Sequence, residues 1–107
     1  MTNFNDRERA EEAHYALDQD MLFRITARRN RLLGHWAAEL MKLSAAEADA
    51  YAKSVVQADF EEAGDEDVIR KLLGDLVSAG IETSEAEIRS ALEAKMVESR
   101  RQIMGES

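Results

Sequence analysis

The sequence predicts an all-α protein, a four-helix bundle with a flexible N-terminal extension. Proline is absent, glycine occurs only five times, and Ala, Glu, Leu, Lys and Arg are abundant, which is typical of helical proteins. Apolar residues recur at helical spacing in four stretches after about residue 18. The loops between these stretches are short, so consecutive helices should be antiparallel neighbours.

The first predicted helix spans about residues 18–42. A helix of this length would be roughly 37 Å long, a full edge of a small bundle. Gly34 lies within it and Gly74 lies within the third helix, each at a cost of about 1 kcal/mol relative to Ala. We expect a neighbouring helix to approach closely at both. The apolar stripe of the first helix consists of Leu22, Ile25, Leu32, Leu33, Trp36 and Leu40.

The second predicted helix starts at Ala45 and ends near Glu62. Ser44 and Glu47 have the spacing of a capping box, in which each side chain binds a free backbone amide of the other residue. Gly64 can take a left-handed conformation after the last turn. The predicted inner face consists of Ala48, Tyr51, Ala52, Val55 and Val56.

The third and fourth predicted helices begin near Asp65 and Ser84. Three acidic residues in the first turn of the third helix interact favourably with the positive end of the helix dipole. Gly80 ends this helix. Ser84 and Glu87 form a second capping box. The inner faces are Val68, Ile69, Leu72, Leu73, Leu76 and Val77 for the third helix, and Ile88, Leu92, Met96 and Ile103 for the fourth.

The first 17 residues should form a flexible segment outside the bundle of residues 18–107. Between Phe4 and Met21 the only large apolar residues are Tyr15 and Leu17, so the bundle offers this segment little to dock on. An isolated helix this short is marginal in water. Two interpretations remain open: a solvated tail or polar extension of the first helix, and a segment that becomes helical on a partner.

Composition argues against several classes of protein. The net charge of −8 disfavours nucleic-acid binding. Cysteine is absent, which excludes disulfides and Cys-based metal sites. No apolar run approaches the roughly 20 residues of a membrane-spanning helix. We see no metal-binding or nucleophile–base pattern and therefore expect neither a metal site nor an enzyme. The acidic run from Asp59 to Asp67 is expected to cap helices and face solvent.

Four arginines, at positions 24, 28, 29 and 31, form a basic patch on the first helix. Helical spacing puts Arg24, Arg28 and Arg31 on nearby faces. The simpler interpretation is pairing with surrounding acids, such as Asp20 with Arg24. The alternative is an anion site for a nucleotide phosphate or an acidic partner.

Three stretches, FNDRERA (4–10), ARRNRLLGHWAAE (27–39) and YAKSVVQADFEEAGDEDVIRK (51–71), occur in an order and spacing that resemble the bacterial zeta subunit family. This is the ATPase inhibitor subunit of the F-type ATP synthase. The resemblance implies a four-helix bundle with a mobile inhibitory N-terminal segment. That segment would enter a catalytic interface beside the central shaft and block rotation in the hydrolytic direction.

The resemblance also implies partners and site residues. The partner would be the catalytic sector, meaning the alpha, beta and gamma subunits, with no membrane insertion. The protein would be a monomer when free, cytoplasmic, and peripheral to the inner membrane through the ATP synthase. Phe4 and Tyr15 would be the apolar anchors. The matching inhibitory positions are Phe4, Asp6, Arg7, Glu8, Ala10, Glu12, Tyr15 and Asp18.

This chain departs from the family pattern at three positions in the same segment. Family members commonly have an aromatic residue where Glu11 stands, often Lys at His14, and His at Leu17. Loss of an aromatic anchor typically weakens binding by roughly 2 kcal/mol or more. We therefore expect weaker binding, and weaker inhibition, from this chain than from members that keep the aromatic residue.

The sequence thus predicts a regulatory inhibitor. The first alternative is a small helical module that senses ATP or ADP through Arg24, Arg28 and Arg31, a weak binding that the resemblance also allows. No other cofactor is expected. A helical adaptor for a different partner is the second alternative.

Overall fold

The computed structural model describes residues 2–61 and 64–105, and for residues 2–18 it describes the course of the backbone but not the side chains. Four helices follow in the order α1 (Thr2–Leu40), α2 (Ala45–Glu61), α3 (Asp65–Ser78) and α4 (Glu85–Met104). The described residues contain no strand. The predicted class, an all-α four-helix bundle with an N-terminal extension, is confirmed.

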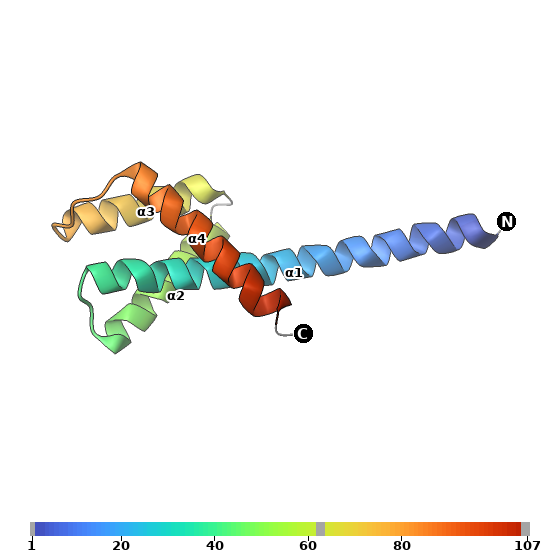
Figure 1. Cartoon of the computed structure of the whole chain (residues 1–107), viewed down its shortest axis with the longest axis horizontal. Coiled ribbons are helices and arrows are strands. Elements are labelled where there is room, and N and C mark those ends of the chain that lie inside the picture. Colours follow the sequence, from blue (N-terminus) through green and yellow to red (C-terminus); the bar gives the residue numbers. More distant parts are fainter. Residues whose placement is uncertain (1, 62–63, 106–107) are drawn as a thin grey trace.

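Helix α1 is far longer than the sequence predicted, because it continues through the proposed extension. It has 39 residues, so its length is roughly 58 Å, close to the 65 Å longest dimension of the molecule. Figure 1 shows its N-terminal half projecting from the bundle. Because neither glycine nor proline occurs before Gly34, no helix breaker separates this half from the packed half. We call residues 2–18 the arm and residues 19–105 the body.

The other helices surround the C-terminal half of α1. Helix α1 contacts all three and packs most extensively on α2 and α4, whereas α2 and α4 make no close backbone approach within the described part of the chain. Helix α3 bridges α2 and α4 and closes the core (Figure 1). The fully buried side chains of the core cluster are Leu33, Ala37, Val55, Val68, Leu72, Leu76 and Ile88.

The predicted helix boundaries are largely confirmed where capping chemistry defined them. The Ser44 Oγ accepts the Glu47 amide and the Ser44 amide donates to the Glu47 carboxylate, completing the capping box. Ser84 caps α4 by accepting the Glu87 amide. Gly80 has φ 82°, the left-handed conformation that stops α3 at low steric cost.

The two glycines inside helices behave differently. A Cβ on Gly34 would lie 2.7 Å from the Ala52 Cα, so the absent side chain lets α1 and α2 approach closely, as predicted. Gly74 has no heavy atom within 4 Å of the same position. The prediction of a close helix approach at Gly74 is therefore wrong, since this glycine faces open space on α3.

Three residues assigned to inner faces are exposed instead. Leu22 is 48% exposed, Leu40 is 39% and Val77 is 57%. Leu22 lies where α1 leaves the body, Leu40 is the last residue of α1, and Val77 is one residue from the end of α3. Helical spacing identifies which face of a helix is apolar. It does not tell how far along the helix a neighbouring helix covers that face.

Candidate functional site

The predicted inhibitory residues all lie on the arm. The backbone places positions 4, 6, 7, 8, 10, 12, 15 and 18 on consecutive turns of α1, outside the bundle (Figure 1). The side chains of Phe4, Asp6, Arg7, Glu8, Ala10, Glu12, Tyr15 and Asp18 lie outside the described residues. The structure therefore shows that these positions follow one another along a single helix. Their side-chain contacts stay predictions.

Helical register connects the arm to the body. Positions 4 and 22 are separated by roughly five full turns, and position 15 precedes position 22 by nearly two turns. The three positions consequently share one face of α1. Leu22, which the sequence assigned to the core, is about half exposed at the body end of this face. Leu22 therefore lies in line with positions 4 and 15, at the point where α1 enters the body.

Two polar contacts, one buried and one partly buried, hold α1 within the body a few turns beyond the arm. The Ser99 hydroxyl of α4 donates to the Ile25 carbonyl oxygen at 2.6 Å, and Ser99 is fully buried. One turn later Arg29, only 2% exposed, donates to the Asp65 carboxylate at the start of α3 at 3.0 Å. These contacts fix the direction in which α1 leaves the body.

Arg29 belongs to a network that joins three helices. Its Nε and Nη2 both donate to the Asn30 side-chain oxygen, and the Asn30 amide donates to the Asp59 carboxylate at 2.9 Å. The network thus binds α1 to the end of α2 and the start of α3. A buried charge is tolerated only when its hydrogen bonds are satisfied in this way, so Arg29 has a structural role and does not belong to the basic patch.

The other three arginines of the patch are exposed and lie together. Arg24, Arg28 and Arg31 line one shallow hollow with Phe23 and Ile103. Within residues 19–61 and 64–105 none of the three makes an ion pair. The predicted Asp20–Arg24 pair is absent from these contacts. Because these three arginines have no acidic partner in this part of the chain, they are free to bind an anion, and the anion-binding interpretation of the patch stays open.

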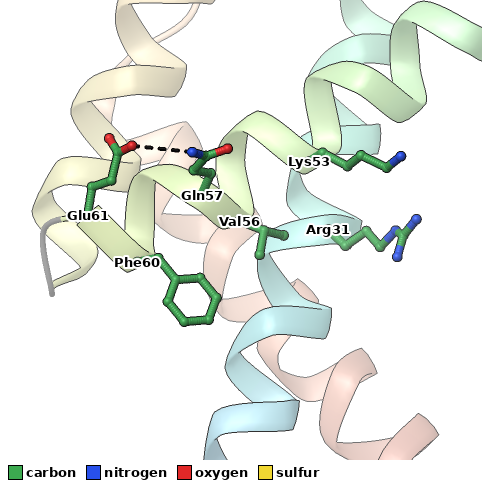
Figure 2. Close-up of a pocket in the computed structure, with 6 residues that line it drawn as sticks. All are labelled: Arg31, Lys53, Val56, Gln57, Phe60 and Glu61. Carbon is green, nitrogen blue, oxygen red and sulfur yellow. Dashed lines mark hydrogen bonds between the residues drawn. The ribbon is translucent and has the colours of Figure 1, made fainter.

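An aromatic pair and a fourth cation extend this surface onto α2. The rings of Phe23 and Phe60 meet edge to face with centroids 5.2 Å apart, although the two residues are 53% and 62% exposed. A hollow of about 490 Å³ lies beside Phe60 on α2. It is lined by Val56 and Gln57 and bordered by Arg31 and Lys53. Figure 2 shows the Arg31 and Lys53 side chains extending in the same direction.

We call this surface the aromatic–basic face. Its residues are Phe23, Arg24, Arg28, Arg31, Lys53, Val56 and Phe60. One acid, Glu61, lines the same hollow as Lys53 and accepts a hydrogen bond from Gln57. Sequence reasoning found its three arginines and missed Phe23, Lys53 and Phe60. The available signal was that Phe23 and Phe60 fall outside the predicted inner faces of their helices.

Three titratable groups of the body have pKa values shifted by contacts that stabilise the fold. Hydrogen bonds from Arg89 hold the pKa of the Glu66 carboxyl below its ordinary value, and bonds to Ser44 do the same for Glu47. Burial, with a hydrogen bond to Asp75, raises the pKa of the Tyr51 hydroxyl. Each of these groups either caps a helix or joins two helices, so the shifts accompany structural contacts.

The described residues contain no group of three or more His, Asp or Glu side chains able to hold a metal ion. None of their helices is long and apolar enough to cross a membrane.

Comparison with known proteins agrees with this architecture. No curated protein matches the chain. A protein with a solution NMR structure is 50% identical, with a TM-score of 0.71 over 81% of this chain and 99% of that one. The family model described as ATPase inhibitor subunit zeta matches residues 1–102, which include the arm and nearly all of the body. The chain therefore belongs to the ATPase inhibitor subunit zeta family.

Proposed function

We propose that this protein inhibits ATP hydrolysis by an F-type ATP synthase, with the arm as its inhibitory element. The arm would enter a catalytic interface between the alpha and beta subunits beside the gamma shaft, and would oppose rotation in the hydrolytic direction. The protein would act as a regulatory subunit and not as an enzyme. It would reach the inner membrane only through the ATP synthase.

The observation that carries the proposal is the projection of the arm from an anchored base. A helix fixed at residues 25 and 29 can present residues 4–18 to a partner while the body stays outside. The contacts of Ser99 and Arg29 supply that anchor. The arm contains few large apolar residues, so its inhibitory contacts should concentrate on Phe4 and Tyr15, with Arg7 and the acids setting orientation.

Ordering the arm has a free-energy cost that the partner must offset. Fixing a backbone residue costs roughly 1–2 kcal/mol, and an isolated helix of this length is marginal in water. The anchored base lowers this cost, because α1 is already nucleated in the body and the arm only has to propagate it. A partner groove would then stabilise a helix whose direction is set in advance.

The test compares the full chain with a chain lacking residues 1–19, added to the cognate catalytic sector. We expect the full chain to inhibit hydrolysis and the shortened chain not to, while circular dichroism shows the body still folded. A full chain with a Val77→Ala substitution is the matched control, because Val77 is exposed on α3. Failure of the full chain to slow hydrolysis would contradict the proposal.

One observation favours a second function, the sensing of ATP or ADP. Arg24, Arg28 and Arg31 border the same hollow as Phe23, and guanidinium groups bind phosphates while an aromatic ring can stack on a base. Titration with ATP and ADP, followed by NMR, tests it. Millimolar nucleotide should shift amide signals of residues 24–31, and unchanged signals would remove this function.

A further inference from the structure

We propose that the aromatic–basic face is a second docking surface, which binds an acidic amphipathic helix of the inhibited ATPase beside the point where the arm enters. The inference rests on the proposed function and goes beyond it, because it gives the body a contact of its own. The arm would supply the inhibition, and this face would fix the body against the partner.

The charge of the face supports an acidic occupant. The whole chain has a net charge of −8, yet Arg24, Arg28, Arg31 and Lys53 gather on one side of α1 and α2. None of these four cations has an ion-pair partner within residues 19–61 and 64–105. Arg29, Arg70 and Arg89 of the body each pair with an acid. Lys42, Arg100 and Arg101 are also outside the ion pairs of these residues, so the distinguishing feature is the grouping of four unpaired cations on one face. Unpaired cations of this kind attract an acidic surface and steer its approach.

The apolar part of the face has the form of a ridge with hollows beside it. More than half of the surface of Phe23 and of Phe60 is exposed, although their rings touch each other. Aromatic side chains that are exposed on a free protein and surrounded by charge are typical anchors of an interface. The cations lie along two helices beside the aromatic pair, an arrangement that suits an elongated helix better than a compact phosphate group.

The arm and the aromatic–basic face lie on the same helix, α1, and this indicates that one partner binds both. Helix α1 is uninterrupted from Thr2 to Leu40, and Phe23 is five residues beyond the end of the arm. Leu22, on the same face as positions 4 and 15, is half exposed beside it. A partner that holds residues 4–18 would therefore lie next to Phe23, within reach of Phe60.

The experiment measures binding of the full chain to the purified catalytic sector in the absence of nucleotide. The variants are Phe60→Ala, which removes half of the aromatic ridge, and the double variant Arg31→Glu, Lys53→Glu. We expect Phe60→Ala to speed dissociation about tenfold. The double variant should slow association several-fold and reduce its dependence on salt.

Two controls match these changes elsewhere in the body. Lys42→Glu reverses an exposed charge in the turn after α1, and Val77→Ala shortens an exposed apolar residue of α3. Both should bind as the unsubstituted chain does. Thermal unfolding of all variants should be unchanged within a few degrees, because each altered side chain is exposed.

The outcomes separate this inference from the proposed function. If the variants of the face bind more weakly but still inhibit fully at saturation, whereas the chain lacking residues 1–19 does not inhibit at any concentration, both proposals stand. If the unsubstituted chain inhibits and the variants bind as tightly as it does, the second docking surface is refuted and the inhibitory arm is not. If the unsubstituted chain neither binds nor inhibits, both are refuted. If the variants differ from it only when ATP is present, the face is a nucleotide site and the inference is wrong.

Discussion

The two halves of α1 are both helical, but the contacts that stabilise the helix differ between them. Residues 25–38 contribute Ile25, Leu33, Ala37 and Ala38 to the core, each at most 4% exposed. The arm is helical over residues 2–18 yet projects from the bundle (Figure 1). Helical backbone alone therefore does not establish packing. The body half owes its helix to burial, whereas the arm half depends on propagation from the body and, in the proposed function, on a partner.

The largest expected effect comes from two leucines of the same helix. Leu33→Ala should lower the free energy of unfolding by about 2–5 kcal/mol, because Leu33 is fully buried and its loss leaves a cavity. Leu22→Ala should cost less than about 1 kcal/mol, since Leu22 is half exposed. Chemical denaturation measures both. Equal losses would mean that α1 is packed at residue 22 as firmly as at residue 33.

The second effect is on inhibition and not on stability. Phe4→Ala should weaken inhibition by roughly 2 kcal/mol, which is about 30-fold in the concentration needed. The midpoint of unfolding should stay where it is, because the arm does not stabilise the body. Titration of ATP hydrolysis and a thermal melt on the same sample provide the two readings. A melt that shifts as far as the titration would show the arm to be part of the packed structure.

A pair of helical glycines provides a third test, with effects of opposite sign. Gly34→Ala should destabilise the body by about 1–3 kcal/mol, since the new methyl group would meet the Ala52 backbone. Gly74→Ala should stabilise it by up to about 1 kcal/mol, because the position is open and Ala favours a helix. Denaturant midpoints reveal the sign directly. Destabilisation by both substitutions would mean that α3 is more closely covered than the structure shows.

The smallest effect is on the pH dependence of the body. The pKa of Glu47 is lowered from 4.5, first by the hydrogen bond from the Ser44 backbone and then by its side chain. A lowered folded-state pKa stabilises the fold above pH 4.5, and this contribution is lost as the pH falls through the folded value. NMR titration of the Glu47 carboxyl should show the shift, and Ser44→Ala should reduce it. An unshifted Glu47 in the unsubstituted chain would rule out the capping box in solution.

Short-range chemistry made much of the fold predictable. The capping boxes at Ser44 and Ser84 and the stop at Gly80 each depend on residues within four positions of one another, so the sequence alone identifies them. The apolar stripes likewise placed Leu33, Leu72 and Ile88 in the core, where they are fully buried.

The long-range contacts could not be predicted in the same way. The Arg29 network joins residues 29 and 65, and the Ser99–Ile25 bond spans 74 positions. Such pairings depend on how the helices pack, and a charged residue such as Arg29 gives no local sign that it will be buried. The same limit hid Phe23 and Phe60, because only the packing of α1 on α2 brings their rings together.

The candidate site divides in the same manner. Helical spacing grouped Arg24, Arg28 and Arg31 correctly, but it could not separate them from Arg29 or add Lys53 of α2. The roles of the arm residues came from the resemblance to the zeta family, and they remain predictions because their side chains lie outside the described residues. The sequence left open whether α1 begins near residue 18 or extends toward the N-terminus as a polar helix, because apolar spacing indicates where a helix packs and not where it begins.

The most direct test of the central claim is amide hydrogen exchange of the full chain, free and bound to the catalytic sector. The claim is that the arm gains its stability from the partner while the body is stable by itself. In the free protein, amides of residues 5–18 should exchange within seconds, and those of the core segments of α1 and α3 should be strongly protected. Binding should protect the arm. Arm amides as protected as those of the core in the free protein would contradict the account.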